Sequence, residues 1–300
     1  MSVPRLSSQF NILHNRFPHS ATPTVVAMSV YHGDNVEWVR EAINSIVTQI
    51  YRKFVFIIVI DGEIPVKMMN LIKDAAFDDE RIVIGQNDSN LGLASSMNHA
   101  IQWAMSLNPR YFARMDADDI SVANRLERQI SYMDKHHNIA VLGSALQEIN
   151  EQGVHVGARV MPANHRQITY LLPRRCTLNH PTVVIRFDVF RAGFLYQGEL
   201  KNTQDYFLWV TLAANGFIFR NLKDRLLKFR RVNDFYKRRG LSKSLNEYRA
   251  RLYAMKKLRR LTVWNLFYAT AVLCLRLMPS KVVKMAYRLD RHLLDRIIRH

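Results

Sequence analysis

The stretch YFARMDADD at residues 111–119 decides the fold class that we expect for this chain. It begins with a largely apolar run typical of a buried strand and ends in three carboxylates, Asp116, Asp118 and Asp119. In extended backbone Asp116 and Asp118 point the same way, and hard oxygen ligands suit Mg²⁺ or Mn²⁺ with open positions for substrate phosphates. The alternative is an acidic turn that caps the next helix, with Asp119 or Ser121 as its N-cap. The stretch alone leaves the metal site and the helix cap equally open.

The same succession of an apolar strand and a polar end recurs upstream. Buried strands and amphipathic helices alternate, with strands predicted at 24–30, 54–60 and 81–85 and helices at 34–47, 66–76 and 93–105. Asp34 and Glu37 form a capping-box-like pair at the start of the first helix. Strand–helix–strand repeats of this length predict an α/β fold with a mainly parallel sheet and right-handed crossovers.

Polar clusters follow four of these strands. They lie at 31–34, 61–62, 87–92 and 116–119. In open α/β sheets, ligands bind in the crevice outside the carboxyl ends of the strands. The four clusters therefore predict one site at a single edge of the sheet.

After residue 141 the alternation becomes less regular. We expect short strands within 142–160 with a turn at 151–153, a strand at 183–185 after His-Pro-Thr at 180–182, and helices at 164–172, 204–215 and from 241 onward. Gly216 is a natural residue to follow the helix that ends near 215. The two cysteines, Cys176 and Cys274, lie far apart, which argues against a disulfide framework or a structural zinc site. The N-terminal residues lack the continuous apolar run of a secretory signal.

Positive charge is concentrated at the C-terminal end. Residues 220–300 hold 23 Lys and Arg against 5 Asp and Glu, whereas residues 1–219 hold 20 of each, so the net charge of +18 lies entirely in the last quarter. Such a region meets polyanions, either nucleic acid or anionic lipid. The apolar run at 261–275 would span about 22 Å as a helix, short of a ~30 Å hydrocarbon core. We therefore favour a helix that lies in the membrane interface, with a helical hairpin packed on the body as the alternative.

Taken together, these segments resemble the family 2 glycosyltransferases of the GT-A fold, above all bacterial enzymes that assemble capsular, exopolysaccharide or O-antigen repeat units. The resemblance covers roughly residues 24–240. It is carried by 25–34, 57–62, NLGLA at 90–94 with Asn98, DADD at 116–119, Arg125 with Gln129, HPT at 180–182 and QDYFLW at 204–209. The chain departs from the family pattern at three places. Ile60-Asp61-Gly62 has one acidic residue before the glycine where the family often has two. Gln204-Asp205 stands where the family has Glu-Asp, and His32 stands where it usually has Asn.

The resemblance implies a role for each matched residue. Asp118, with Asp116, would hold Mn²⁺ or Mg²⁺ against the diphosphate, and Asp116 could also bond the ribose. Asp205 would act as the general base of a direct displacement that inverts the anomeric carbon. A plain first-turn acid of a helix is the alternative for Asp205. Without its usual acidic neighbour, Asp205 would have a lower pKa than in relatives.

The remaining matched residues would bind the two substrates. Asp61 would accept from a uracil-type base, Tyr31 would stack on that base, Asn90 and Gly92 would shape the sugar-diphosphate pocket, and Arg114 would support the aspartates or contact the donor sugar. His180, Gln204 and Trp209 would lie on the acceptor side. Arg238 and Arg239 would close over the diphosphate or meet lipid headgroups.

These implications define the expected protein. It comprises an N-terminal lead at 1–23, a catalytic domain at 24–240 (24–120 for the nucleotide sugar, 121–240 for the acceptor) and a basic, membrane-associating region at 241–300. We expect a UDP-sugar donor, a lipid-linked saccharide acceptor and a place at the cytoplasmic face of the inner membrane. A nucleic-acid-binding protein is less favoured, because its motifs are missing. A sugar-phosphate nucleotidyltransferase would need a Gly- and Lys-rich loop that 31–34 does not supply.

Overall fold

The structure is a computed structural model that describes residues 9–18, 24–197, 203–232 and 241–276. Within these ranges ten strands form one sheet in the order β1-β4-β3-β2-β5-β9-β7-β10-β6, with β8 paired to β7. The strands are β1 Phe10–Asn15, β2 Thr24–Val30, β3 Phe54–Asp61, β4 Ile82–Asn87, β5 Tyr111–Met115, β6 Ile120–Ser121, β7 Ile139–Ile149, β8 His155–Arg159, β9 Val184–Arg186 and β10 Ile218–Arg230. This is the mixed, mainly parallel α/β sheet that the sequence predicts.

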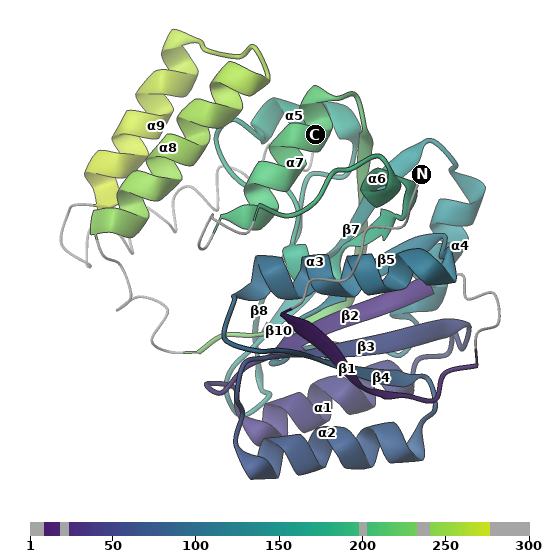
Figure 1. The fold of residues 1–300 in the computed structure, drawn as a ribbon. Coiled ribbons are helices and arrows are strands. Elements are labelled where there is room, and N and C mark those ends of the chain that lie inside the picture. The colour runs from purple at the N-terminus through teal and green to yellow at the C-terminus, as the bar shows by residue number, and fades with distance from the viewer. Residues whose placement is uncertain (1–8, 19–23, 198–202, 233–240, 277–300) are drawn as a thin grey trace.

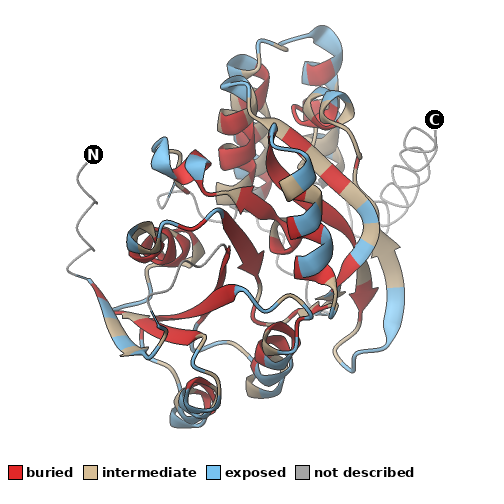
Figure 2. Cartoon of the chain, turned by 90° about the vertical axis from the view of Figure 1, so that its right-hand side faces the viewer, coloured by how far each residue is buried: buried red, intermediate tan, exposed pale blue. Residues whose placement is uncertain are grey.

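Helices cover both faces of the sheet (Figure 1). They are α1 Val36–Val47, α2 Val66–Asp78, α3 Leu93–Ala104, α4 Arg125–Lys135, α5 His165–Leu171, α6 Asp188–Arg191, α7 Gln204–Ala214, α8 Leu241–Lys257 and α9 Val263–Arg276, with short 3₁₀ turns η1 Met105–Leu107 and η2 His180–Thr182. Two buried apolar clusters result, one between the sheet and α1, α2 and α4, the other between the sheet and α3, α5 and α7. Buried strands and one-sided burial of the helices are visible in Figure 2.

The first half has the parallel strand arrangement that the sequence predicts. β2 pairs in parallel with β3 and with β5, and β3 pairs in parallel with β4. Every residue of β3 is buried, as expected for a strand covered on both faces. Parallel pairing brings the carboxyl ends of these strands to one edge of the sheet, where the four polar clusters lie.

Three local features differ from those that the sequence predicts. Phe10–Asn15, within the expected lead, is an edge strand that pairs antiparallel with β4. The N-cap of α1 is Asn35, whose side chain accepts from the backbone N–H groups of Glu37 and Trp38, while Asp34 turns back to accept from the N–H of Tyr31. The helix after the acidic motif begins only at Arg125, so neither Asp119 nor Ser121 caps it.

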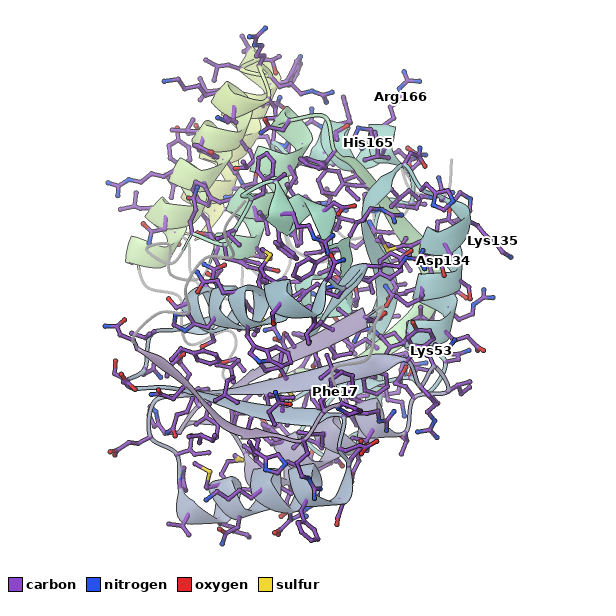
Figure 3. The ribbon with its side chains drawn as sticks, turned by 45° about the vertical axis from the view of Figure 1, so that its right-hand side comes forward. Phe17, Lys53, Asp134, Lys135, His165 and Arg166 are labelled. Carbon is purple, nitrogen blue, oxygen red and sulfur yellow. The ribbon has the colours of Figure 1, made fainter. Side chains whose placement is uncertain are left out.

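The second half extends the sheet with mixed strand directions. β9 is antiparallel to both β5 and β7, whereas β10 runs parallel to β7 over most of its length. Side chains labelled in Figure 3 tie helices to this part of the sheet. Asp134 of α4 accepts from the Tyr111 hydroxyl at 2.5 Å, and His165 of α5 accepts from the backbone N–H of Phe219 at 3.2 Å.

The last described residues form a helical hairpin, α8 and α9, that packs on α7. Ala250, Ala254 and Ala269 are buried at its contacts, in agreement with a hairpin on the body. Across the described ranges no helix is both long and apolar enough to cross a bilayer.

Candidate active site

Three carboxylates gather at the carboxyl ends of β2 and β5. Asp34 follows β2, and Asp116 and Asp118 follow β5. Burial, followed by the charge of Asp116, raises the pKa of Asp118 to about 6. Burial also raises the pKa of Asp34 to about 7, with smaller contributions from Asp118 and Asp116. The three side chains therefore share one electrostatic environment that favours a bound cation.

Asp34 belongs to the strand-end cluster at 31–34 that the sequence predicts, and it does not take its other predicted role at the cap of a helix. The sequence placed it at the start of a helix, because an acid followed three residues later by Glu37 suggests a capping box. Its position directly after a buried strand was the signal for a place in the strand-end cluster.

Arg114 lies within β5 and is 1% exposed. Its guanidinium forms an ion pair with Asp116, so the expectation that this buried cation needs an acidic partner is confirmed. Its carbonyl accepts from the Arg125 side chain at 2.7 Å. The Nε and Nη1 atoms of Arg114 find no hydrogen-bond partner among the described residues, which leaves two buried donors for a substrate.

Asp119 has a different environment from Asp116 and Asp118. It is fully buried, and burial followed by the charge of Asp118 holds its pKa well above the ordinary value. Its carboxylate accepts from the backbone N–H of Arg230 at 2.9 Å, so the predicted role as a helix cap is wrong.

Arg230 is a site residue whose contacts the sequence does not reveal. It lies at the end of β10, and its side chain donates to the carbonyls of Asp118, Asn150 and Glu151 and pairs with Glu41. The guanidinium also lies 5.1 Å from the centroid of Trp38. It thereby fixes the turn that carries the acidic motif against β10. No local pattern could indicate a partner 112 residues away.

Asp61, at the end of β3, organises the neighbouring loop. Its Oδ1 accepts from the Asn87 side chain and from the N–H of Leu91, and its Oδ2 accepts from the N–H of Gly92, each at 2.8 Å. The side chain is 3% exposed. Asp61 thus shapes the 88–92 loop, while its predicted contact with a base stays a prediction.

Gly62, the residue after Asp61, leaves room for the backbone of the 88–92 loop to approach closely. Gly62 has φ +83°, and a Cβ there would lie 2.7 Å from the backbone nitrogen of Asn90. Gly92, with φ +85°, directly precedes α3. Tyr31 is 40% exposed at the end of β2, where a planar ligand can reach its ring.

Asp205 lies in the first turn of α7. Burial raises its pKa, the charge of Asp116 raises it further, and that of Arg114 lowers it, so these groups lie within electrostatic range of one another. The side chain stays partly exposed, and the Cys176 thiol lies 3.9 Å from its Oδ2. The neighbouring Gln204 has a buried Oε1 that no described residue bonds.

The two other residues predicted to lie on the acceptor side, His180 and Trp209, differ in their exposure to solvent. His180 is partly exposed and bonds the Tyr196 hydroxyl at 3.1 Å. Trp209 is 0% exposed and packs on His180 and Phe219, so it supports the pocket from the core and cannot touch an acceptor. Arg238 and Arg239 lie outside the described residues.

The site suits a divalent cation that completes its coordination with phosphate. Among the described side chains no three His, Cys, Asp or Glu are grouped to hold a metal alone. Mg²⁺-type sites, however, commonly use one or two carboxylates plus substrate phosphates and water. Asp116 and Asp118 are two carboxylates at one strand end whose charges repel each other, which fits that arrangement.

Comparisons with known proteins identify relatives of this chain. The model of the family "Glycosyl transferase family 2" matches residues 25–196. The amylovoran biosynthesis glycosyltransferase AmsE of Erwinia amylovora is 29% identical, over 89% of this chain and 98% of the relative. The uncharacterized glycosyltransferase MJ1057 of Methanocaldococcus jannaschii is 31% identical, over 70% and 72%. A UDP-Gal:alpha-D-GlcNAc-diphosphoundecaprenol beta-1,3-galactosyltransferase of Escherichia coli is 26% identical, over 72% and 76%.

Two solved structures share the fold. TarS 1–349 of S. aureus, in complex with UDP-GlcNAc, superposes with a TM-score of 0.59 at 16% identity, over 87% of this chain and 83% of that chain. The mannosyltransferase PcManGT of Pyrobaculum calidifontis, in complex with GDP-Man and Mn²⁺, gives 0.52 at 12% identity, over 98% and 86%. The family match spans more than half of the chain. It argues against the two alternative functions, nucleic-acid binding and nucleotidyl transfer. The chain is a glycosyltransferase and belongs to glycosyl transferase family 2.

Proposed function

We propose that this enzyme transfers a sugar from a UDP-sugar to a saccharide acceptor, with a divalent cation and with inversion at the anomeric carbon. One observation carries the proposal: Asp116 and Asp118 follow β5, and Asp205 in the first turn of α7 lies close enough for the charge of Asp116 to raise its pKa. A transferase needs these two functions, a site for the leaving diphosphate and a base for the acceptor hydroxyl, on opposite sides of the transferred sugar.

Asp118 and Asp116 would hold Mn²⁺ or Mg²⁺. When bound, the cation supplies Lewis-acid stabilisation of the leaving diphosphate. The Mn²⁺ complex of the structural relative PcManGT supports this choice of metal. Arg114 keeps Asp116 oriented through their ion pair, and its free Nε–H and Nη1–H groups would donate to the donor.

Asp205 would take the proton of the acceptor hydroxyl. Its carboxylate is shielded enough to have a raised pKa and is still reachable from solvent, both of which suit a general base. The hydroxyl oxygen then attacks the anomeric carbon from the side opposite to the diphosphate. Direct displacement by one base, without an enzyme nucleophile, inverts that carbon.

The nucleotide would lie over the ends of β2 and β3. Tyr31 would stack on the base, and the 88–92 loop, held by Asp61, would line the diphosphate pocket. The UDP-GlcNAc complex of TarS and the UDP-Gal activity in the name of the E. coli relative support a UDP-sugar.

The acceptor would be lipid-linked and presented at an anionic membrane, in the assembly of a surface polysaccharide. The names of two relatives, an amylovoran enzyme and an enzyme for a diphosphoundecaprenol acceptor, support this. On α9, Val263, Trp264 and Phe267 are 84%, 74% and 64% exposed, an apolar surface beside the basic Lys256 and Lys257. Such a surface fits the interface of a cytoplasmic leaflet. Residues 24–240 would then be the catalytic domain and 241–300 the membrane-associating region.

A hydrolysis assay over a panel of UDP-sugars, with Mn²⁺ or Mg²⁺, tests the proposal. Asp118→Ala and Asp205→Asn should each lower kcat by about 100-fold or more. Asp224→Asn, which removes an exposed carboxylate on β10 that pairs with Arg128, is the matched control and should leave kcat unchanged. Unchanged turnover in both site variants would overturn the mechanism.

A further inference from the structure

Tyr196 is a buried residue that joins the two halves of the site. Its backbone N–H donates to Asn98 Oδ1 at 3.0 Å, and its carbonyl accepts from Asn98 Nδ2 at 2.7 Å. Asn98 belongs to α3, the helix that follows the Asp61-held loop. A side-chain amide that binds both backbone groups of a residue 98 positions away fixes that residue firmly.

The hydroxyl of Tyr196 in turn fixes His180. The Tyr196 oxygen lies 3.1 Å from His180 Nε2, and the two rings meet edge to face with centroids 5.5 Å apart. Trp209 contacts the same imidazole with a centroid distance of 6.2 Å. Tyr196 is 3% exposed, whereas His180 is partly exposed, so of the two residues His180 is the one with surface that a ligand can contact.

Both members of the pair are neutral at physiological pH. Burial lowers the pKa of His180 well below its ordinary value, and the charge of Arg114 lowers it further. Burial raises the pKa of Tyr196 far above its ordinary value. Neutral partners suit sugar hydroxyl groups, which are themselves uncharged donors and acceptors.

The position of the pair agrees with this chemistry. The turn that holds His180 lies against β5, because the backbone N–H of Arg114 donates to the Val183 carbonyl at 3.0 Å. On the other side, the imidazole packs on Trp209 of α7, the helix that carries Asp205. The transferred sugar must occupy the space between those two sides.

We propose that His180 hydrogen-bonds a hydroxyl group of the donated sugar and that Tyr196 is the positioning residue that orients His180 for this contact. The inference rests on the proposed function and moves His180 from the acceptor to the donor sugar. His180 thereby contributes to the choice of sugar, because a buried polar group built to meet a hydroxyl discriminates against donors that do not present one.

The test compares UDP with the UDP-sugar that the wild-type enzyme hydrolyses fastest in the panel. Tyr196→Phe removes one hydroxyl and should raise the KM of that UDP-sugar by about 10-fold while leaving the inhibition constant of UDP unchanged. Tyr206→Phe is the matched control, because Tyr206 is also buried and its hydroxyl bonds, within the described part of the chain, only the Leu172 carbonyl, at 2.5 Å. It should change neither constant.

A double-mutant cycle with His180→Gln separates positioning from general damage. If Tyr196 acts through His180, the double variant should be no worse than His180→Gln alone. Additive effects, a parallel loss of UDP affinity, or an unchanged KM in Tyr196→Phe would each overturn the inference. If the wild-type enzyme hydrolyses no UDP-sugar, the proposed function itself fails and the inference falls with it.

Discussion

Replacing Asp61 by Asn tests whether Asp61 mainly anchors the 88–92 loop or contacts the nucleotide directly. In the structure the Asp61 carboxylate accepts three hydrogen bonds of 2.8 Å, from Asn87, Leu91 and Gly92. An Asn amide can place its oxygen towards Asn87 and Leu91, but its NH₂ group then faces the N–H of Gly92. One charge-assisted bond is lost, one buried donor is orphaned, and two bonds lose their charged acceptor.

We expect Asp61→Asn to lower the free energy of unfolding by about 2–4 kcal/mol, since a hydrogen bond to a charged group contributes roughly 1.5–3 kcal/mol. For a chain of this size that is a Tm decrease of about 5–10 °C. UDP affinity should fall as well, because the 88–92 loop loses its anchor. Differential scanning fluorimetry and urea unfolding measure the first effect, and calorimetric titration with UDP and Mn²⁺ the second.

The matched control is Asp88→Asn in the same loop. The Asp88 carboxylate accepts one exposed bond from Asn11 at 3.0 Å, so its loss should change stability by less than about 0.5 kcal/mol. If Asp61→Asn instead weakens UDP binding at an unchanged Tm, the anchor argument is refuted and the direct contact with the base is favoured.

Three further predictions concern charge and the C-terminal hairpin. In EDTA, Asp118→Asn should be more stable than the wild type by about 1–2 kcal/mol above pH 6 in urea unfolding, because a pKa raised from 3.8 to about 6 makes ionisation cost the folded state. This advantage should grow between pH 4 and 6 and vanish below. The raised pKa of Asp205 predicts that kcat falls towards acid at a pH above 3.8, measured at saturating metal. Trp264→Ser with Phe267→Ser should reduce co-sedimentation with anionic liposomes several-fold, whereas Val66→Ser on α2, 76% exposed, should not.

The sequence predicts what depends on local pattern. Apolar strand runs such as 54–60 and the polar residues after them identify the sheet and its ligand-binding edge, because parallel strands in open sheets end at the same side. It also predicts that buried Arg114 needs a carboxylate, since an unpaired buried charge is too costly. The roles of Asp116, Asp118 and Asp205 stay predictions that the geometry supports.

Contacts between distant segments are what the sequence does not reveal. Asn35 takes the N-cap of α1 in place of Asp34, a choice between two adjacent cap formers that only the tertiary position of Asp34 decides. The motif QDYFLW at 204–209 predicts that Trp209 lies on the acceptor side. In the structure this motif is helical, and the Trp209 side chain lies on the face of the helix that is buried in the core. Tyr196 belongs to no motif in the sequence, and its contacts are Asn98 and His180, far away along the chain.

The three carboxylates of the acidic stretch at 116–119 have different environments, and these environments favour different roles. Three carboxylates so close together need compensation, and the protein supplies it unequally. Asp119 receives a backbone N–H and, through Arg230, a rigid connection to β10. Asp116 receives the guanidinium of Arg114, and Asp118 receives neither an ion pair nor a side-chain hydrogen bond from any described residue. The least compensated carboxylate is the one that gains most from a cation, so the division of partners itself favours Asp118 as the principal metal ligand and Asp119 as the support that holds it in place.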